Sequence, residues 1–239
     1  MPALIGAVVL SAAGGVLVAL ATGVARFDPT TASLRALVAP EPAAAGNRMN
    51  DSKTDRAGRL WSSTMRDFGA AASGALYRID PPANATRVLD GLIVPNALAW
   101  SPDDRTLYFA DTRDGRLRAY EFDAASGSLG AMRVLLPAGA VPGNPDGATV
   151  DADGGVWNAR FGGSRVVRIT PGGIVDRVIE LPVSQPTSCA LGDADLRTLY
   201  ITTAHQRLDA DALRAQPDAG ALFAVRVDTP GLPEPECRL

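Results

Sequence analysis

Most of the side chains in this sequence that could do chemistry are carboxylates. The chain has 21 aspartates but only five glutamates, with a single histidine, His205, and two cysteines, Cys189 and Cys237. A zinc site built from histidine and cysteine needs more of these residues than the chain contains. Any bound metal is therefore expected to be a hard cation held by oxygen atoms.

Two short motifs could place such oxygens. They are Pro145-Asp-Gly147 and Val94-Pro-Asn-Ala97. From the residues alone, Asp146 is better interpreted as a turn residue, Asn96 as the polar entrance to a strand, and Arg48 as a solvated loop cation. Asp151-Ala-Asp-Gly154 hints at a calcium loop, but the spacing of later acidic residues does not fit one, so a hairpin turn is predicted.

Nucleophilic catalysis has little support. His205 would have to serve any Ser-His-Asp arrangement, with Ser188 or Ser164 as the nucleophile, yet no G-x-S-x-G motif is present. His205 is predicted to lie in a loop after the strand 199–203. Cys189 is interpreted as a core thiol and Cys237 as a tail thiol, with no disulfide between them.

The overall composition is that of an ordinary globular protein. The 239 residues are 46% hydrophobic and 21% charged, with a formal net charge of −3. No basic tail indicates a nucleic-acid partner. Lys53 is the only lysine, and neither a phosphate-loop motif nor G-x-G-x-x-G occurs, which argues against nucleotide binding.

The first 25 residues carry no charged side chain. A signal peptide has positive charge ahead of its apolar stretch, whereas the first cation in this sequence is Arg26. Gly14-Gly15 also divides the apolar run, so two strands joined by a tight turn are predicted, with an export or membrane segment as the alternative. A cytoplasmic location without a membrane partner is expected.

Internal repetition predicts the fold class. Five copies of a unit of three or four strands can be aligned, with about 45 residues between successive first turns. Such a period favours an all-β propeller, forming a single domain over residues 1–239. The one segment with helical character is 208–216. The first turns of the five units are predicted at Gly15, Gly58, Asp104, Gly154 and Leu196.

Three segments in order carry a resemblance to a known family. Asn47–Trp61, Pro95–Pro102 and Pro145–Asp151 resemble the SMP-30/gluconolactonase/regucalcin family of sugar lactonases. The resemblance covers about residues 10–228. It implies a six-bladed β-propeller, of which this chain would lack about one to one and a half N-terminal blades.

The resemblance also implies a function and a site. It implies a hydrolase of carbohydrate metabolism that opens aldonolactones, such as gluconolactone or a pentonolactone, to the free sugar acid. One divalent cation, Ca²⁺, Zn²⁺, Mn²⁺ or Mg²⁺, would be bound by Asn96 and Asp146, and Asp146 would also act as the catalytic base. Arg48 and Asn50 would bind the lactone, while Asp51 would be a structural neighbour.

Several departures from the family's pattern leave a second interpretation open. The family's metal-binding glutamate lies in a Glu-Gly-Pro motif that is missing from this sequence, and Glu41 is placed in a loop. Ala97 replaces a usual glycine, and Asp67 is offset from an acidic position found in some members. The alternative is a truncated, non-catalytic propeller that binds a metal or sugar acid weakly or serves as a scaffold. Its open strand edge at 7–10 would allow self-association.

Overall fold

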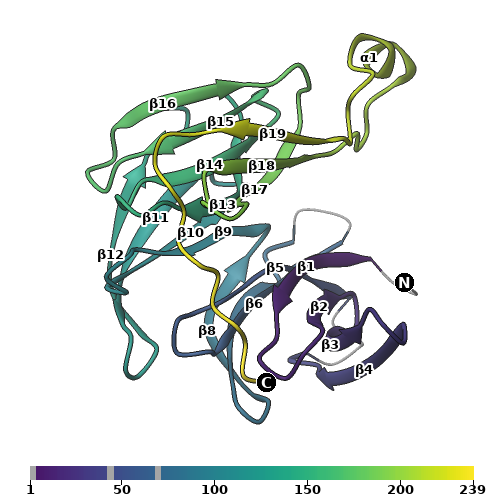
Figure 1. Cartoon of the computed structure of the whole chain (residues 1–239), viewed down its shortest axis with the longest axis vertical. Coiled ribbons are helices and arrows are strands. Elements are labelled where there is room, and N and C mark those ends of the chain that lie inside the picture. Colours follow the sequence, from purple (N-terminus) through teal and green to yellow (C-terminus); the bar gives the residue numbers. More distant parts are fainter. Residues whose placement is uncertain (1–3, 42–45, 68–70) are drawn as a thin grey trace. The chain divides into compact units, whose positions relative to one another are not determined.

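The computed structural model describes residues 4–41, 46–67 and 71–239. Within these residues the chain forms five antiparallel sheets, in which hydrogen-bonded neighbours follow one another along the sequence (Figure 1). Successive up-and-down sheets of three or four strands are the pattern of a β-propeller. The predicted all-β propeller class is confirmed.

Each sheet corresponds to one sequence repeat. The strands of the first two sheets are β1 (Ile5–Leu10), β2 (Val16–Leu20), β3 (Gly23–Asp28), β4 (Ser33–Val38), β5 (Asn47–Thr54), β6 (Leu60–Arg66), β7 (Gly74–Asp80) and β8 (Asn84–Leu92). The third and fourth sheets contain β9 (Pro95–Trp100), β10 (Thr106–Asp111), β11 (Arg116–Asp123), β12 (Ser128–Leu136), β13 (Asn144–Val150), β14 (Val156–Phe161), β15 (Arg165–Ile169) and β16 (Val175–Glu180). The fifth contains β17 (Pro186–Gly192), β18 (Thr198–Thr203) and β19 (Leu222–Arg226).

The number of sheets corrects one expectation. The described residues form five sheets, and not six blades with part of the N-terminal region missing. Residues 5–38 form a four-stranded sheet of their own rather than a fragment of one. The five repeats already occupied nearly the whole sequence, so the sheet count follows from the repeat count and not from the family resemblance.

The five predicted first turns share one backbone feature. All five residues have positive φ: 65° at Gly15, 82° at Gly58, 57° at Asp104, 83° at Gly154 and 53° at Leu196. Positive φ allows a tight turn to match the twist of the strands that it joins. Glycine accepts this conformation without steric cost, whereas Leu196 adopts it at the expense of some strain.

One helix interrupts the strands of the described chain. α1 (Ala210–Ala215) lies between β18 and β19, and the Asp209 side chain caps it by accepting a hydrogen bond of 2.8 Å from the Ala212 N–H. This agrees with the helical character predicted for 208–216. No helix in the described residues is long and apolar enough to cross a membrane.

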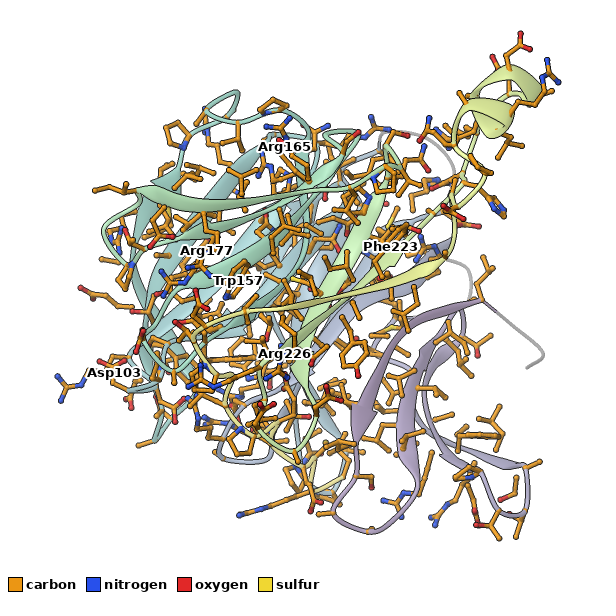
Figure 2. All side chains as sticks on the ribbon, turned by 45° about the horizontal axis from the view of Figure 1, so that its top comes forward. Asp103, Trp157, Arg165, Arg177, Phe223 and Arg226 are labelled. Carbon is orange, nitrogen blue, oxygen red and sulfur yellow. The ribbon has the colours of Figure 1, made fainter. Side chains whose placement is uncertain are left out.

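The chain divides into two compact units. The first comprises residues 1–98, 122–130 and 234–239, and the second comprises 99–121 and 131–233. In the second unit, buried Trp157, Leu199 and Ile201 belong to one apolar cluster, with Phe223 packed against it. Trp157 and Phe223 are labelled in Figure 2. The prediction of a single domain is not tested by this division.

The C-terminal residues belong to the first unit and are anchored there. The Cys237 N–H donates to the Leu10 carbonyl and the Ala12 N–H donates to the Cys237 carbonyl, both at 2.9 Å. Cys237, interpreted from the sequence as a tail thiol, is therefore a buried residue of the apolar cluster around Leu17. Cys189 is buried as predicted, and both cysteines are free.

The predicted strand edge at 7–10 lies in β1. This strand packs closely against β5, because a Cβ at Gly6 would lie 2.7 Å from the Met49 carbonyl oxygen. Leu4 and Val8 are nevertheless more than half exposed. Self-association through this part of the molecule stays a prediction.

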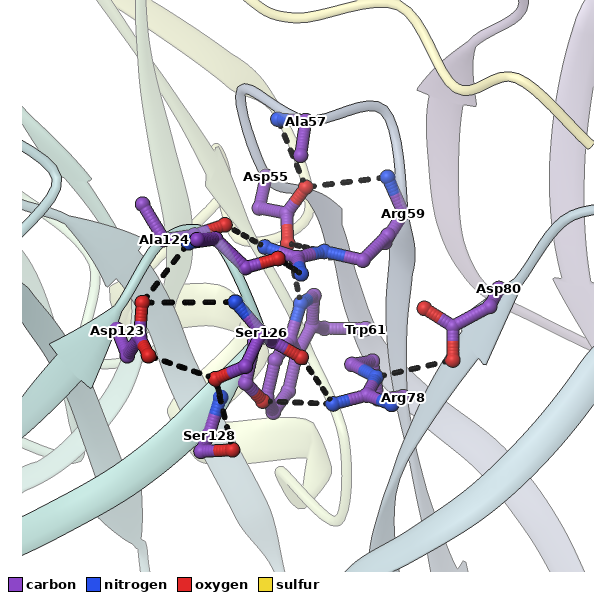
Figure 3. A network of polar contacts seen from close by, with 12 residues as sticks. Asp55, Ala57, Arg59, Trp61, Arg78, Asp80, Asp123, Ala124, Ser126 and Ser128 are labelled. Carbon is purple, nitrogen blue, oxygen red and sulfur yellow. Dashed lines mark hydrogen bonds and ion pairs between the residues drawn. The ribbon is translucent and has the colours of Figure 1, made fainter.

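In two of the sheets, a buried aspartate side chain stabilises the first turn by accepting hydrogen bonds. Asp55 accepts from the N–H groups of Ala57 and Arg59, from Arg59 Nε at 2.6 Å and from Trp61 Nε1 at 2.9 Å (Figure 3). The aspartate, glycine and tryptophan recur at the same spacing in Asp151, Gly154 and Trp157.

At this second position, Asp151 accepts from the N–H groups of Asp153 and Gly155 and from Trp157 Nε1. The segment is thus a hairpin turn, as predicted, and not a calcium loop. The aspartate side chain satisfies turn N–H groups that would otherwise be buried without partners.

Candidate functional site

Two of the predicted site residues lie at equivalent backbone positions. The register of β5 with β6 shifts between Met49 and Ser52, and the register of β13 with β14 shifts between Pro145 and Ala148. Asn50 lies within the first shift and Asp146 within the second. A bulge-like shift re-aims side chains that regular pleating would direct elsewhere, and such shifts are common beside active sites.

In the first unit, three predicted residues form one hydrogen-bonded group. Arg48 Nη1 donates to Asn50 Oδ1 at 2.9 Å, and Asn50 Nδ2 donates to Asn96 Oδ1 at 3.0 Å. Asn50 Nδ2 also donates to the Pro95 carbonyl at 2.9 Å. Arg48 thus lies in strand β5 and not in a solvated loop, and hydrogen bonds hold its side chain in place.

Asp67 completes this group, although the sequence motif gave no reason to include it. Arg48 Nε donates to Asp67 Oδ1 at 2.7 Å. The side chains of both residues are partly buried, which makes their ion pair less screened than one on the surface. Although Asp67 is offset from the acidic position found in some family members, the long Arg48 side chain reaches it.

Glu41 has a separate role. Its carboxylate accepts from Thr64 Oγ1 at 2.6 Å, from Asn47 Nδ2 at 2.8 Å and from the Tyr77 hydroxyl at 3.1 Å. Desolvation is the main cause that raises the pKa of Tyr77, with Glu41 adding to it. These contacts give Glu41 a structural role in holding neighbouring strands.

Asp51 and Ala97 follow Asn50 and Asn96 in the sequence and support the hydrogen-bonded group of Arg48, Asn50 and Asn96. The Leu98 N–H donates to Asp51 Oδ2 at 2.9 Å, while desolvation raises the pKa of the Asp51 carboxyl. This agrees with the structural role predicted for Asp51. Ala97 is buried and has a φ of 62°, which explains why glycine is expected beside Asn96.

In the second unit, Asp146 lies on strand β13 rather than in the turn that its motif suggested on its own. The Gly147 N–H donates to Asp146 Oδ1 at 3.0 Å. A Cβ at Gly147 would lie 2.2 Å from Ser188 Oγ. Glycine is thus required after Asp146 by a close approach to Ser188 and not by a turn.

A buried amide supports the Asp146 backbone. Asn158 Nδ2 donates to the Asp146 carbonyl at 2.8 Å and, more weakly, to the Gly147 carbonyl at 3.3 Å. Asn158 Oδ1 in turn accepts from Arg160 Nη1 at 3.2 Å. Both Asn158 and Arg160 are fully buried.

The sequence reasoning overlooked this pair. The available signal was two polar residues at alternate positions of an otherwise apolar strand, 156–161.

The metal prediction has limited support in the donor set. Among residues 4–41, 46–67 and 71–239, no group of three or more His, Cys, Asp or Glu side chains is placed to hold a metal ion. Asn96, in the first unit, would contribute an amide oxygen and Asp146, in the second unit, a carboxylate; that both bind one ion stays a prediction. Oxygen donors of this kind suit a hard divalent cation, but a single negative charge would hold it weakly.

The remaining candidate residues are those considered for nucleophilic catalysis. His205 lies exposed in the loop after β18, as predicted. Ser188 packs against Gly147, and Ser164 lies in a turn with a φ of 54°. In the described part of the chain, neither serine is hydrogen-bonded to His205.

Comparison with known proteins gives the family. Residues 1–205 match the profile of the SMP-30/Gluconolactonase/LRE-like region. A 6-deoxy-6-sulfogluconolactonase from Pseudomonas putida is 36% identical over 236 residues, covering 98% of this chain and 81% of that protein. A regucalcin from Danio rerio is 37% identical over 225 residues, covering 93% of this chain and 76% of that protein.

A solved structure agrees with these sequence relatives. The calcium-binding protein regucalcin from Agrobacterium tumefaciens strain C58 superposes with a TM-score of 0.94 and 31% identity, covering 100% of this chain and 81% of that one. The predicted family resemblance is confirmed by both kinds of comparison. The chain belongs to the SMP-30/gluconolactonase/LRE-like family.

Proposed function

We propose that the chain is a lactone hydrolase that opens sugar lactones, such as gluconolactone or a pentonolactone, to the free sugar acids. The observation that carries this proposal is the equivalent placement of Asn50 and Asp146 in the register shifts of β5 and β13. The name of the Pseudomonas putida relative, a lactonase for a sulfonated gluconolactone, supports the same reaction class.

In this proposal, the first unit supplies the substrate-binding donors. Arg48 is oriented by Asp67 and Asn50, so its guanidinium is held before any ligand arrives. A fixed planar fork suits the hydroxyl and carbonyl oxygens of a sugar lactone better than a flexible ammonium. Pre-orientation lowers the entropy cost of binding.

Asp146 is proposed to act as the base. Its carboxylate accepts a proton from water while the water oxygen attacks the lactone carbonyl carbon. The bond from that carbon to the ring oxygen then breaks, and the proton returns to the ring oxygen as a hydroxyl. One water is consumed, and the product is a hydroxy acid.

A divalent cation is proposed to assist, with Asn96 and Asp146 among its ligands. When bound, such an ion supplies Lewis-acid polarisation of the carbonyl. The relative from Agrobacterium tumefaciens is described as calcium-binding, which supports a hard cation. Asn50 Nδ2, which donates to Asn96 Oδ1, would fix the orientation of the Asn96 amide for this role.

A non-catalytic propeller is the second candidate function. The observation that favours it is the absence, within the described residues, of a cluster of three or more typical metal-binding side chains. In that case the Arg48 and Asn96 group would bind a sugar acid without turnover. Binding of gluconate without hydrolysis of gluconolactone would distinguish this candidate from the enzyme.

Asp146→Ala tests the proposed base. We expect kcat/KM for gluconolactone to fall by about 10²- to 10⁴-fold, the usual contribution of a general base. Asp153→Ala is the matched control, because Asp153 is an exposed aspartate in a hairpin turn of the same sheet. Acid release measured at constant pH reports both variants, and activity retained in Asp146→Ala would remove this residue from the mechanism.

A further inference from the structure

Arg160 is a fully buried charged side chain to which the proposed mechanism gives no role. Its relative exposure is 0%. It lies on β14, where alternation directs Trp157 and Ala159 into the apolar cluster and places Asn158 and Arg160 on the opposite face. A cation in such a place requires compensation, because transferring a charge out of water is costly.

The compensation that the described residues provide is incomplete. Arg160 Nη2 donates to the Gly143 carbonyl at 2.7 Å and Nη1 donates to Asn158 Oδ1 at 3.2 Å, both neutral acceptors. Nε is buried and has no hydrogen-bond partner in the described part of the chain. A guanidinium has five N–H donors, so several remain available.

No carboxylate within the described residues balances this charge. Burial lowers the pKa of Arg160 to about 10, which still leaves the guanidinium protonated at neutral pH. Two other arginines differ from Arg160 in having carboxylate partners: the buried Arg59 pairs with Asp55 and the partly buried Arg168 pairs with Asp151, each at 2.6 Å. Arg160 is thus a buried cation without a carboxylate partner among the described residues.

Arg160 is also connected to the proposed catalytic residue. Asn158 accepts from Arg160 through its oxygen and donates to the Asp146 carbonyl through its nitrogen. One amide side chain therefore links the guanidinium to the backbone of Asp146. A group bound at Arg160 would lie near the residue that is proposed to perform the hydrolysis.

We propose that Arg160 binds an oxyanion carried by the substrate, so that the preferred sugar lactone bears a carboxylate or sulfonate in addition to its lactone ring. This inference rests on the proposed lactone hydrolysis. Carboxylate and sulfonate oxygens accept two hydrogen bonds from one guanidinium, and such charge-assisted bonds are stronger than those to the neutral acceptors now present.

The Gly143 carbonyl is the acceptor that an incoming oxyanion would replace. It belongs to the segment 137–143, where Gly139 and Gly143 have φ values of 74° and 81°. Residues 137–140 of this segment are exposed. A change in this segment could release the guanidinium without disturbing β14.

Two lactones that differ in one group test the inference. D-Glucaro-1,4-lactone carries a carboxylate where D-glucono-1,4-lactone carries a hydroxymethyl group. We expect the unmodified chain to prefer the anionic lactone by about 10- to 100-fold in kcat/KM, the value of a hydrogen bond to a charged group. A C6-sulfonated gluconolactone, compared in the same assay, distinguishes sulfonate from carboxylate as the favoured anion.

Arg160→Gln should abolish this preference, because it should lower kcat/KM for the anionic lactone far more than kcat/KM for the neutral one. Arg165→Gln is the matched control, because Arg165 (labelled in Figure 2) is paired with Arg160 in the β14–β15 register. Unlike Arg160, Arg165 contacts the exposed Glu180. An equal loss of kcat/KM for both lactones in Arg160→Gln, or an unchanged preference for the anionic lactone, would overturn the inference. Arg160→Lys keeps the charge without the planar fork and should reduce the preference only in part.

A binding measurement separates this inference from the proposed function. Glucarate should raise the midpoint of thermal unfolding of the unmodified chain and of Arg165→Gln, but not that of Arg160→Gln. Sorbitol at the same concentration and ionic strength is the neutral control. Glucarate stabilisation without any lactone turnover would support the anion site and refute the hydrolase. Lactone turnover with neither anion preference nor glucarate stabilisation would support the hydrolase and refute the anion site.

Discussion

The two groups of residues proposed to act on a lactone differ in how their arginines are balanced. Arg48, in the first unit, has Asp67 at 2.7 Å and an amide on its other side. Arg160, in the second unit, is more deeply buried and has two neutral acceptors. The first arrangement is complete without a ligand. The second leaves a charge that an anionic ligand could complete.

A third arginine shows that this difference in ionic partners does not depend on the sheet in which the arginine lies. Arg168 lies on β15, next to the strand that carries Arg160, and contacts both Asp151 and Asp176. The hydrogen bond with Asp151 is the main cause that raises the pKa of Arg168, whereas burial lowers that of Arg160. Within one sheet, a structural arginine has carboxylate partners and Arg160 has none among the described residues.

Arg168→Met should have the largest effect on stability. It leaves Asp151, whose side chain is fully buried, without its cationic partner. Breaking a buried pair on one side costs about 3–5 kcal/mol. Chemical denaturation should report that decrease in the free energy of unfolding, and a loss below about 1 kcal/mol would contradict a structural role for the pair.

Arg48→Ala tests the balanced arginine. We expect KM for gluconolactone to rise and kcat/KM to fall by about 10- to 100-fold, because a charged donor to the substrate is lost. Affinity for a divalent cation should change little, since Asn96 and Asp146 are the proposed ligands. Steady-state kinetics with a parallel metal titration measures both quantities, and an unchanged KM would exclude Arg48 from the site.

Arg160→Met sharpens the contrast with Arg168. Removing a buried charge that lacks an ionic partner relieves a desolvation cost, so the free energy of unfolding should stay the same or rise by about 1 kcal/mol. The same denaturation experiment serves for both variants. A destabilisation as large as that of Arg168→Met would show that Arg160 is a structural residue after all.

Ala97→Gly should have the smallest effect. A buried alanine with a φ of 62° is strained by roughly 1–2 kcal/mol, and part of the gain from relief is offset by the flexibility of glycine in the unfolded chain. We expect stabilisation of about 1 kcal/mol at most. An increase in the midpoint of thermal unfolding checks it, and a decrease would show that the Ala97 methyl group contributes more by packing than its backbone costs.

The sequence was sufficient to predict the repeat, the turns and most of the first-unit group. Local chemistry determines the repeat and the turns: glycine or aspartate marks four of the five first turns, and hydrophobic alternation marks the strands. Arg48, Asn50 and Asn96 came from the family resemblance. The register shifts around Asn50 and Asp146 could not be predicted, because an extra residue in a strand leaves the pattern on either side intact.

The partners of the charged residues could not be predicted from the sequence either. Whether Arg48 reaches Asp67, or Arg160 lacks a carboxylate, depends on which side chains converge from separate strands. The six-bladed architecture came from the family resemblance alone, and the five repeats were the better guide.

Hydrolysis by the unmodified 239-residue chain tests the central claim most directly. Acid release from gluconolactone and from a pentonolactone would be followed at constant pH after chelation, and again after Ca²⁺, Mn²⁺ or Zn²⁺ is added back. The account predicts enzyme-dependent turnover that chelation lowers and a divalent cation restores. A folded sample that releases no acid above the uncatalysed rate, with or without added cation, would contradict it.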